Sequence, residues 1–226
     1  MKIQTPHTWQ LDTREAQKIQ SELAPKLIFK NIGINPNLIA GADVSVTRFG
    51  KIGRAALVLL DFHTLDMVET STAEGEINFP YIPGLLSFRE APLIMQAFHK
   101  LSHIPDVVIV DGQGIAHPRR FGIASHLGLL LDIPTIGCAK SRLIGSYSEV
   151  PDRVGAFSFL YEGDEIIGAV VRTRQGIKPV YVSIGHKIDL LTAISCVLNC
   201  CRGLRLPEPT RLAHLLANNR LGNLKR

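Results

Sequence analysis

The chain has 226 residues, of which 46% are hydrophobic and 20% charged, and it carries a net charge of +5. This length fits a domain whose core is large enough to fold without a metal or a disulfide. The high apolar content and low net charge exclude disordered, collagen-like and low-complexity classes of protein. We therefore expect a single folded domain over residues 1–226.

The sequence favours the cytoplasm as the protein's compartment. No run of about 18 apolar residues occurs, so we expect no membrane-spanning helix and no membrane partner. Residues 1–7 lack the apolar stretch of a secretory signal. The four cysteines contain no CxxC pair, which favours reduced thiols in a core over a zinc site. No feature of the sequence indicates a protein partner.

The positive charge is concentrated at the C-terminal end of the chain. A basic segment on a neutral body is typical of phosphate binding, but it also occurs as a solvated tail, and the charge count favours neither interpretation. The whole net charge is carried by residues 202–226, where the only acid is Glu208 and the basic residues are Arg202, Arg205, Arg211, Arg220, Lys225 and Arg226.

Strand-like segments occur in two groups. Three β-prone runs separated by short turns come first, and they predict an antiparallel meander. A nearly all-apolar run at residues 106–111 then predicts a strand buried on both faces, with further strands after it. The expected strands are Leu38–Val46, Ala55–Phe62, Leu65–Thr72, Asp106–Asp111, Thr135–Ala139, Val154–Leu160, Ile166–Thr173 and Val180–Ile184.

Helical segments alternate with the later strands, which predicts an α/β fold with a mixed sheet around one core. Pro25 should break or kink the first helix. Ser87 followed by Glu90 has the pattern of a capping box, and Thr210 is the expected cap of the last helix. The expected helices are Thr13–Lys30, Ser87–Leu101, Arg120–Leu131, Ile188–Cys201 and Thr210–Asn219.

Three carboxylates stand where a functional site is expected. Asp43 lies in an apolar run, Asp111 ends the buried strand, and Glu90 begins the helix before that strand. A buried carboxylate is costly unless a cation or hydrogen bonds compensate it, and carboxylates are the ligands that Mg²⁺ prefers. If the three meet, they suit metal-assisted hydrolysis of a phosphodiester. The alternative is that each acid occupies a turn, an edge or a helix cap.

The segment before Glu90 predicts a stiff loop with an aromatic tip. Pro80 and Pro83 fix the backbone around Tyr81, and Gly84 permits a sharp turn. An aromatic wedge of this kind can enter a base stack and hold a base out of the helix. The alternative is a proline-rich turn with a packed tyrosine.

Several motifs, taken in order, resemble those of the endonuclease V family. The resemblance runs from about Thr13 to the last helix. The matching segments are Pro80–Glu90 (PYIPGLLSFRE) and Val110–Gly128, with shorter matches at Ile39–Ser45, Ile136–Ser141 and Ser183–His186.

This resemblance implies a ribonuclease-H-like fold, in agreement with a meander followed by an α/β unit. It also implies a DNA repair endonuclease that uses Mg²⁺, with Mn²⁺ able to substitute. The expected reaction flips deoxyinosine into a pocket and hydrolyses the second phosphodiester bond on its 3′ side. The expected product is a nick with a 3′-hydroxyl and a 5′-phosphate.

The resemblance also implies roles for individual residues. Asp43 and Asp111 match the metal-binding aspartates, Glu90 the third active-site carboxylate and His214 an active-site histidine. Tyr81 matches the wedge residue. The other residues expected at the lesion or the DNA are Pro83, Gly84, Leu86, Arg89, Gly112, His117, Ile123, Lys140 and Leu143.

Two other functions remain open at the level of the sequence. The same nuclease could act mainly on inosine in RNA, because no residue indicates contacts to the 2′-hydroxyl group that distinguishes RNA from DNA. A non-catalytic nucleic-acid-binding protein on the same scaffold is the second alternative, and the three intact carboxylates argue against it.

Overall fold

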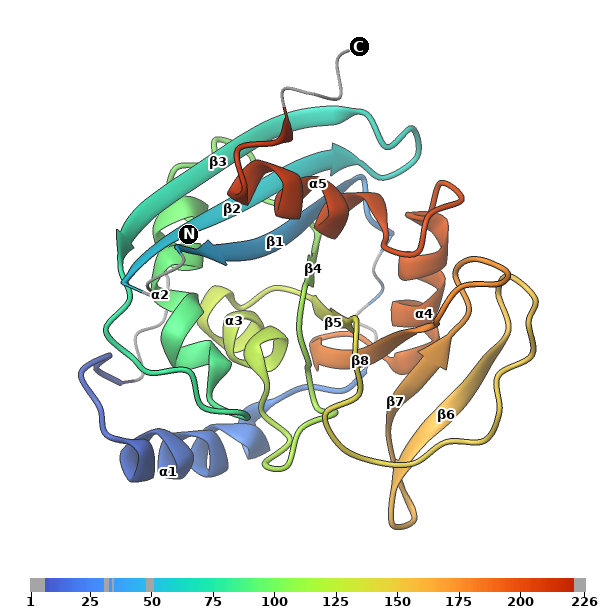
Figure 1. Ribbon diagram of the computed structural model, residues 1–226, viewed down its shortest axis with the longest axis horizontal. Coiled ribbons are helices and arrows are strands. Elements are labelled where there is room, and N and C mark those ends of the chain that lie inside the picture. Colours follow the sequence, from blue (N-terminus) through green and yellow to red (C-terminus); the bar gives the residue numbers. More distant parts are fainter. Residues whose placement is uncertain (1–6, 31–32, 34, 48–50, 222–226) are drawn as a thin grey trace.

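A computed structural model describes residues 7–30, 33, 35–47 and 51–221. These residues form one eight-stranded mixed sheet with helices on both faces (Figure 1), which confirms the expected α/β class. The helices are α1 (Thr13–Leu23), α2 (Leu86–Phe98), α3 (Ile123–Leu131), α4 (Leu190–Asn199) and α5 (Glu208–Ala217). The strands are β1 (Leu38–Val46), β2 (Ile52–Asp61), β3 (Met67–Glu76), β4 (Val107–Val110), β5 (Thr135–Ala139), β6 (Phe157–Glu162), β7 (Glu165–Val171) and β8 (Val180–His186).

The sheet has the strand order β3-β2-β1-β4-β5-β8-β7-β6. Strands β1, β2 and β3 form the predicted antiparallel meander, and β4 and β5 extend it in parallel with β1. The β6–β7 hairpin joins the far side of the sheet through β8. Strands β1, β4 and β5 therefore end at the same edge of the sheet, where open α/β sheets bind ligands.

Two apolar layers cover the central strands. One layer contains Val107 and Ile109 together with residues of α4 and α5, and the other contains Val108 and Val110 together with residues of α2 and α3. All four valine and isoleucine side chains of β4 are buried. The nearly all-apolar run in the sequence therefore follows from burial on both faces of the strand.

Helix α5 lies directly against β1. A Cβ atom at Gly41 would lie 2.0 Å from the backbone of Pro209, so the absence of a side chain at this strand position permits the contact. This close approach sets the position of α5 across the strand that carries Asp43.

Two predicted helix caps are wrong. Helix α2 follows Leu85, and Ser87 lies buried inside its first turn, so Ser87 and Glu90 form no capping box. Helix α5 begins at Glu208, because Pro209 fits the first turn of a helix. The backbone N–H groups of that turn have no acceptor within the helix, so the N–H that proline lacks is not needed there. Thr210 instead donates its hydroxyl to the carbonyl oxygen of Pro207.

Other boundaries shift for local reasons. Arg120 has a φ of +53°, so α3 begins only after Gly122, and Leu65 has a φ of +58°, so it lies in the turn before β3. Helix α1 ends at Leu23 and a 3₁₀ turn with Pro25 follows, which confirms the expected break.

The cysteines lie mostly in the core. All four cysteines are free thiols, and Cys138, Cys196 and Cys200 are buried. Among the described residues, no helix is both long and apolar enough to cross a membrane.

Candidate active site

Asp43 and Asp111 lie side by side on neighbouring parallel strands. The register pairs Ala42 of β1 with Val110, the last residue of β4, and the residue that follows each of these two is an aspartate. The amide N–H of Asp111 donates to the carbonyl oxygen of Ala42. Because side chains alternate along a strand, Asp43 and Asp111 point to the same face as Gly41, the face that α5 covers.

His214 and Lys140 contact these two carboxylates. The Nδ1 atom of His214, on α5, lies 2.7 Å from Oδ2 of Asp43. The Nζ atom of Lys140, the residue after β5, forms an ion pair with Oδ2 of Asp111. Both aspartates are largely buried, whereas the side chains of His214 and Lys140 are partly exposed. Lys140 thus offsets the negative charge of Asp111, and the ring of His214 contacts the carboxylate of Asp43.

Glu90, on α2, belongs to the same electrostatic environment. Burial, together with the charges of Asp43 and Asp111, raises the pKa of Glu90 to about 8. Burial and the charge of Asp111 likewise raise the pKa of Asp43, although the hydrogen bond from His214 opposes this shift. Carboxyl groups that lie close together hinder one another's ionisation. Such a cluster is typical of a site that binds a cation.

The donor atoms present fit a divalent metal ion. Ligand atoms of Asp43, Asp111 and His214 all lie within 4.8 Å of one another. Carboxylate oxygens are the ligands that hard divalent cations prefer, so this group of residues can hold a metal ion. Glu90 is not one of these three residues, so its expected place among the ligands stays a prediction.

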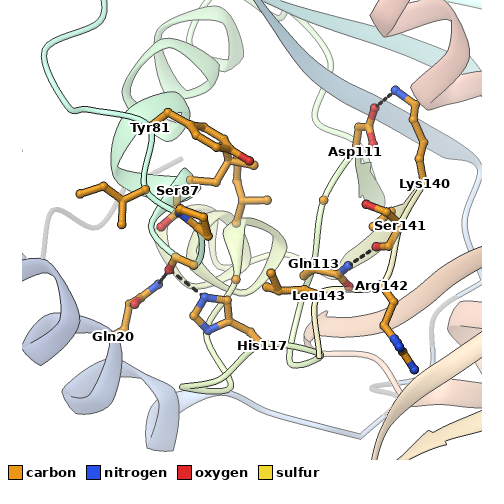
Figure 2. Close-up of a pocket in the computed structure, with 18 residues that line it drawn as sticks. Gln20, Tyr81, Ser87, Asp111, Gln113, His117, Lys140, Ser141, Arg142 and Leu143 are labelled. Atoms are coloured by element: carbon orange, nitrogen blue, oxygen red, sulfur yellow. Dashed lines mark hydrogen bonds and ion pairs between the residues drawn. The ribbon is translucent and has the colours of Figure 1, made fainter. Parts of the chain in front are cut away.

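A cavity of about 300 Å³ adjoins the acidic cluster (Figure 2). It is formed by the segments after β4 and β5, by the loop before α2 and by the start of α3. Asp111 lines it and connects it to the cluster. The other lining residues are Gln20, Tyr81, Ile82, Pro83, Gly84, Leu86, Ser87, Gly112, Gln113, His117, Gly122, Ile123, Ala139, Lys140, Ser141, Arg142 and Leu143.

Tyr81 stands at the rim of this cavity. Its side chain is 68% exposed, so the interpretation of a packed turn tyrosine is wrong. Figure 2 shows Tyr81 on the side of the cavity opposite Asp111 and Lys140. An exposed ring held between prolines can contact a ligand in the cavity without a prior rearrangement of the loop.

His117 is a buried, neutral hydrogen-bonding residue of the cavity wall. Its Nε2–H donates to the carbonyl oxygen of Gly84 at 2.8 Å, and its Nδ1 accepts the amide N–H of Arg119. Burial lowers the pKa of His117 to about 4, with a smaller contribution from the charges of Arg119 and Arg120. His117 therefore orients the loop that carries Gly84.

Comparison with known proteins identifies the family. The family model for endonuclease V matches residues 21–215. The endonuclease V of Dehalococcoides mccartyi is 51% identical over 217 residues, which cover 96% of this chain and 97% of the relative. The chain belongs to the endonuclease V family. It is accordingly a nuclease, and its acidic cluster and cavity together are its candidate active site.

Solved structures of endonuclease V share this fold. The enzyme of Streptomyces avermitilis superposes with a TM-score of 0.90 at 39% identity, and each chain is covered completely. The Ciona intestinalis endonuclease V, at 28% identity and a TM-score of 0.80, was crystallised with a 23mer DNA containing an inosine followed by a ribo-adenosine; that alignment covers 94% of this chain and 98% of the other.

The structure brings most of the expected site residues together. Asp43, Glu90, Asp111, His214 and Lys140 share the acidic cluster, and Tyr81, Pro83, Gly84, Leu86, Gly112, His117, Ile123 and Leu143 line the cavity. Arg89 does not line this cavity: its Nη1 atom donates to the carbonyl oxygen of Phe79, and its positive charge acts on the neighbouring Glu90, so its expected role at the DNA stays a prediction.

Sequence reasoning missed several cavity residues, among them Gln20 and Gln113. Gln20 falls at the helical spacing of the buried residues Ala16 and Leu23, so a polar residue on an apolar helix face was the available signal. Gln113 donates its amide to the carbonyl oxygen of Ser141, which ties the segment after β4 to the segment after β5.

Proposed function

We propose that this member of the endonuclease V family nicks DNA at the second phosphodiester bond 3′ to deoxyinosine. The product has a 3′-hydroxyl and a 5′-phosphate. The observation that carries the proposal is the continuity between a cluster of carboxylates and a cavity with an exposed aromatic rim. The Ciona relative in complex with inosine-containing DNA supports the choice of substrate. The enzyme acts as a single domain, and its site of action is the cytoplasm.

Asp43 and Asp111 would hold the divalent ion, and Glu90 would complete the set of ligands directly or through water. The chemistry that Mg²⁺ or Mn²⁺ supplies when bound is stabilisation of negative charge on the phosphate and leaving oxygens. The raised pKa of Glu90 disfavours its ionisation, and a cation bound beside it would favour the carboxylate. The unusual clustering of carboxyl groups is thereby explained.

His214 and Lys140 assist hydrolysis of the phosphodiester, and both side chains are partly exposed to solvent. The contact of Nδ1 with Asp43 orients the imidazole of His214, so that Nε2 is the atom that can accept or donate a proton. A partly exposed imidazole can move a proton between water and the scissile phosphodiester. Lys140 pairs with Asp111, and its partly exposed ammonium group can bind a phosphate oxygen of the DNA.

Recognition of the lesion precedes cleavage. The flipped base enters the cavity, and the ring of Tyr81 replaces the stacking that the base has lost. The residues in this part of the wall are small or apolar, with Gly84, Gly112 and Ile123 among them. A cavity of about 300 Å³ lies within the range of about 300–1,000 Å³ usual for small-ligand sites.

Inosine in RNA is the second candidate substrate. The Ciona complex supports RNA as a candidate substrate, because the nucleic acid in that complex carries a ribo-adenosine directly after the inosine. Cleavage rates on matched DNA and RNA strands, each with one inosine, decide between the two substrates.

The proposal is tested by mapping the nick. A 5′-labelled DNA strand with one deoxyinosine is incubated with the enzyme in Mg²⁺ or in chelator, beside an identical strand with deoxyadenosine. We expect one product that ends after the nucleotide 3′ to the lesion, only in Mg²⁺ and only from the inosine strand. Equal cutting of both strands, full activity in chelator, or release of the free base contradicts the proposal.

A further inference from the structure

Residues 7–12, which we call the N-terminal strap, precede α1 and bridge helices α2 and α3. The centroid of the His7 ring lies 5.6 Å from that of Phe88 on α2 and 5.0 Å from that of His126 on α3. The ring of Trp9 contacts the same two rings, at centroid distances of 6.3 and 5.4 Å. The strap therefore contacts both of the helices that begin at the wall of the cavity.

His7 and His126 share one hydrogen bond, and its geometry fixes their tautomers. Nδ1 of His7 lies 2.6 Å from the carbonyl oxygen of Thr8, which only accepts, so Nδ1 carries the proton of the neutral ring. Nε2 of His7 lies 2.8 Å from Nε2 of His126. Since Nε2 of His7 is then the acceptor, His126 donates its Nε2–H. Nδ1 of His126 is consequently unprotonated, and this buried atom has no hydrogen-bond partner in the described part of the chain.

Protonation of the pair is incompatible with this hydrogen bond. A second proton on His7 places an N–H group opposite the N–H of His126, and a second proton on His126 creates a fully buried cation. Burial lowers the pKa of His7, although the hydrogen bond with Thr8 opposes this shift. Burial and the charge of His7 lower the pKa of His126 well below its ordinary value. Below about pH 6.5 the detached strap therefore binds protons more readily than the packed strap, so acid favours detachment.

Among the described residues, no carboxylate pairs with either histidine. Phe88 of α2, Phe121 of the loop before α3 and Trp9 of the strap pack around the histidine of α3. The charged groups beside the strap are Glu76, at the end of β3, and Arg89 of α2, which line a second cavity together with Trp9. The two histidines thus meet a fall in pH without a carboxylate partner to stabilise their charged forms.

The strap also supports the loop that carries Tyr81. Phe79 precedes this loop tip and Ile82 follows it, and both belong to a small apolar cluster at the start of α2. Trp9 and Leu11 of the strap pack against the same cluster. The residues on both sides of Tyr81 therefore rest on apolar contacts that the strap completes. The buried members of the cluster are Ala16, Phe79, Leu85 and Phe88.

We propose that the pair His7–His126 holds the strap against the Tyr81 loop and that protonation of the pair releases the strap. This inference rests on the proposed role of Tyr81 in lesion binding. While the strap is packed, the loop keeps one position and the aromatic ring stands ready at the cavity rim. When the strap detaches, the loop loses part of its apolar support and the ring stacks less well. The two histidines are positioning residues, since neither lines the cavity.

Trp9 is the only tryptophan of the chain, so its fluorescence reports the strap directly. Quenching of this fluorescence by acrylamide measures the access of solvent to Trp9, and it is compared between about pH 8 and about pH 5 in four proteins. These are wild type, His7→Ala, His7→Gln and the control His63→Gln, which replaces an exposed histidine. Glutamine at position 7 can accept the N–H of His126 and does not titrate. Far-UV circular dichroism on the same samples shows that the proteins are folded.

We expect quenching of wild type and of His63→Gln to be weak at about pH 8 and to rise severalfold in acid, below about pH 6.5. His7→Ala should be strongly quenched at every pH, because both the hydrogen bond and the ring are gone. His7→Gln should be weakly quenched at about pH 8 and should respond to acid much less than wild type. The same pH response in His7→Gln and wild type, or quenching of His7→Ala equal to that of wild type in the alkaline samples, overturns the inference.

A double-mutant cycle connects the strap to Tyr81. Affinity for inosine-containing duplex is measured in chelator at about pH 8 for wild type, His7→Ala, Tyr81→Ala and the double variant. We expect His7→Ala to weaken binding severalfold in the wild-type background and to have no further effect beside Tyr81→Ala, because both changes act through one ring. An equal loss in both backgrounds overturns the inference. Tyr81→Ala that binds duplex as wild type does overturns the proposed role of Tyr81 instead, and the quenching measurement does not depend on that role.

Discussion

His214 and Asp43 are 171 positions apart in the sequence, and a 2.7 Å hydrogen bond joins their side chains. The contact exists because α5 crosses β1 at Gly41, where a side chain would collide with Pro209. The last helix is thus part of the core and of the active site at once. Removing the chain after Pro209 would delete Leu212 and Ala213, which belong to the core, so a truncation cannot separate the role of the basic tail from stability.

Replacing either aspartate with asparagine should abolish nicking and leave the fold intact. Asp43→Asn and Asp111→Asn each remove a negative charge and keep nearly the same shape. We expect nicking to fall at least about a hundredfold, since a bound metal supplies several kcal/mol of transition-state stabilisation. Single-turnover nicking and thermal unfolding are measured on the same samples. If activity and thermal stability fall in parallel, the acids are structural.

Replacing Tyr81 should affect duplex substrates most. Stacking on an aromatic side chain contributes about 1–3 kcal/mol per base, so Tyr81→Ala should bind inosine-containing duplex more weakly by this order. The loss should be smaller on single strands, where less stacking is disrupted. Tyr81→Phe should keep most of the activity, because the ring and not the hydroxyl performs the task. Cleavage of matched duplex and single strands at limiting enzyme checks this. Wild-type activity of Tyr81→Ala on duplex would show that Tyr81 is no wedge.

Arg220 is an exposed cation that follows α5, and it offers a test of the basic tail without loss of the core. If it contacts a phosphate, Arg220→Gln should lower the slope of log affinity against log salt by roughly 0.9. Lys26→Gln, at an exposed position after α1, is the control and should leave the slope unchanged. Equal slopes for all three proteins would assign Arg220 to solubility alone. Lys225 and Arg226 lie outside the described residues.

His117 should make the protein less stable in mild acid. Its pKa is about 4 in the folded protein and about 6.5 when exposed, so between these values the unfolded chain binds the extra proton. The contribution of His117 to stability is therefore complete above about pH 6.5 and is lost as the pH falls to about 4. Glutamine can keep a donor for Gly84 and does not titrate. The difference in free energy of unfolding between wild type and His117→Gln, measured with urea, should fall across this window. Parallel curves would contradict the assignment.

The sequence predicts the strands better than the helix ends. Strands β1 and β5 begin and end at the predicted residues, because Asn37 and Thr47 flank the first run and Pro134 and Lys140 flank the second. Ser87 and Thr210 fail as caps because a local pattern does not reveal that Ser87 packs inward or that Pro209 fits a first turn.

The acidic site is only partly readable from the sequence. Asp43 and Asp111 stand out as carboxylates beside apolar strands, and the parallel register of β1 and β4 explains why they meet. Gln20 does not stand out in this way, because its partners Gly84 and Phe121 lie 64 and 101 positions away. Contacts of this range depend on the packing of whole elements, which a residue pattern does not specify.

The central claim is that the carboxylate pair binds the divalent ion that nicking requires. The most direct measurement is a calorimetric titration of Mn²⁺ into wild type, Asp111→Asn and the exposed control Asp164→Asn, with inosine-strand affinity measured in parallel. We predict that Asp111→Asn loses Mn²⁺ binding and keeps its affinity for the inosine strand, while the control binds both as wild type does. Mn²⁺ binding by Asp111→Asn equal to that of wild type would contradict the claim.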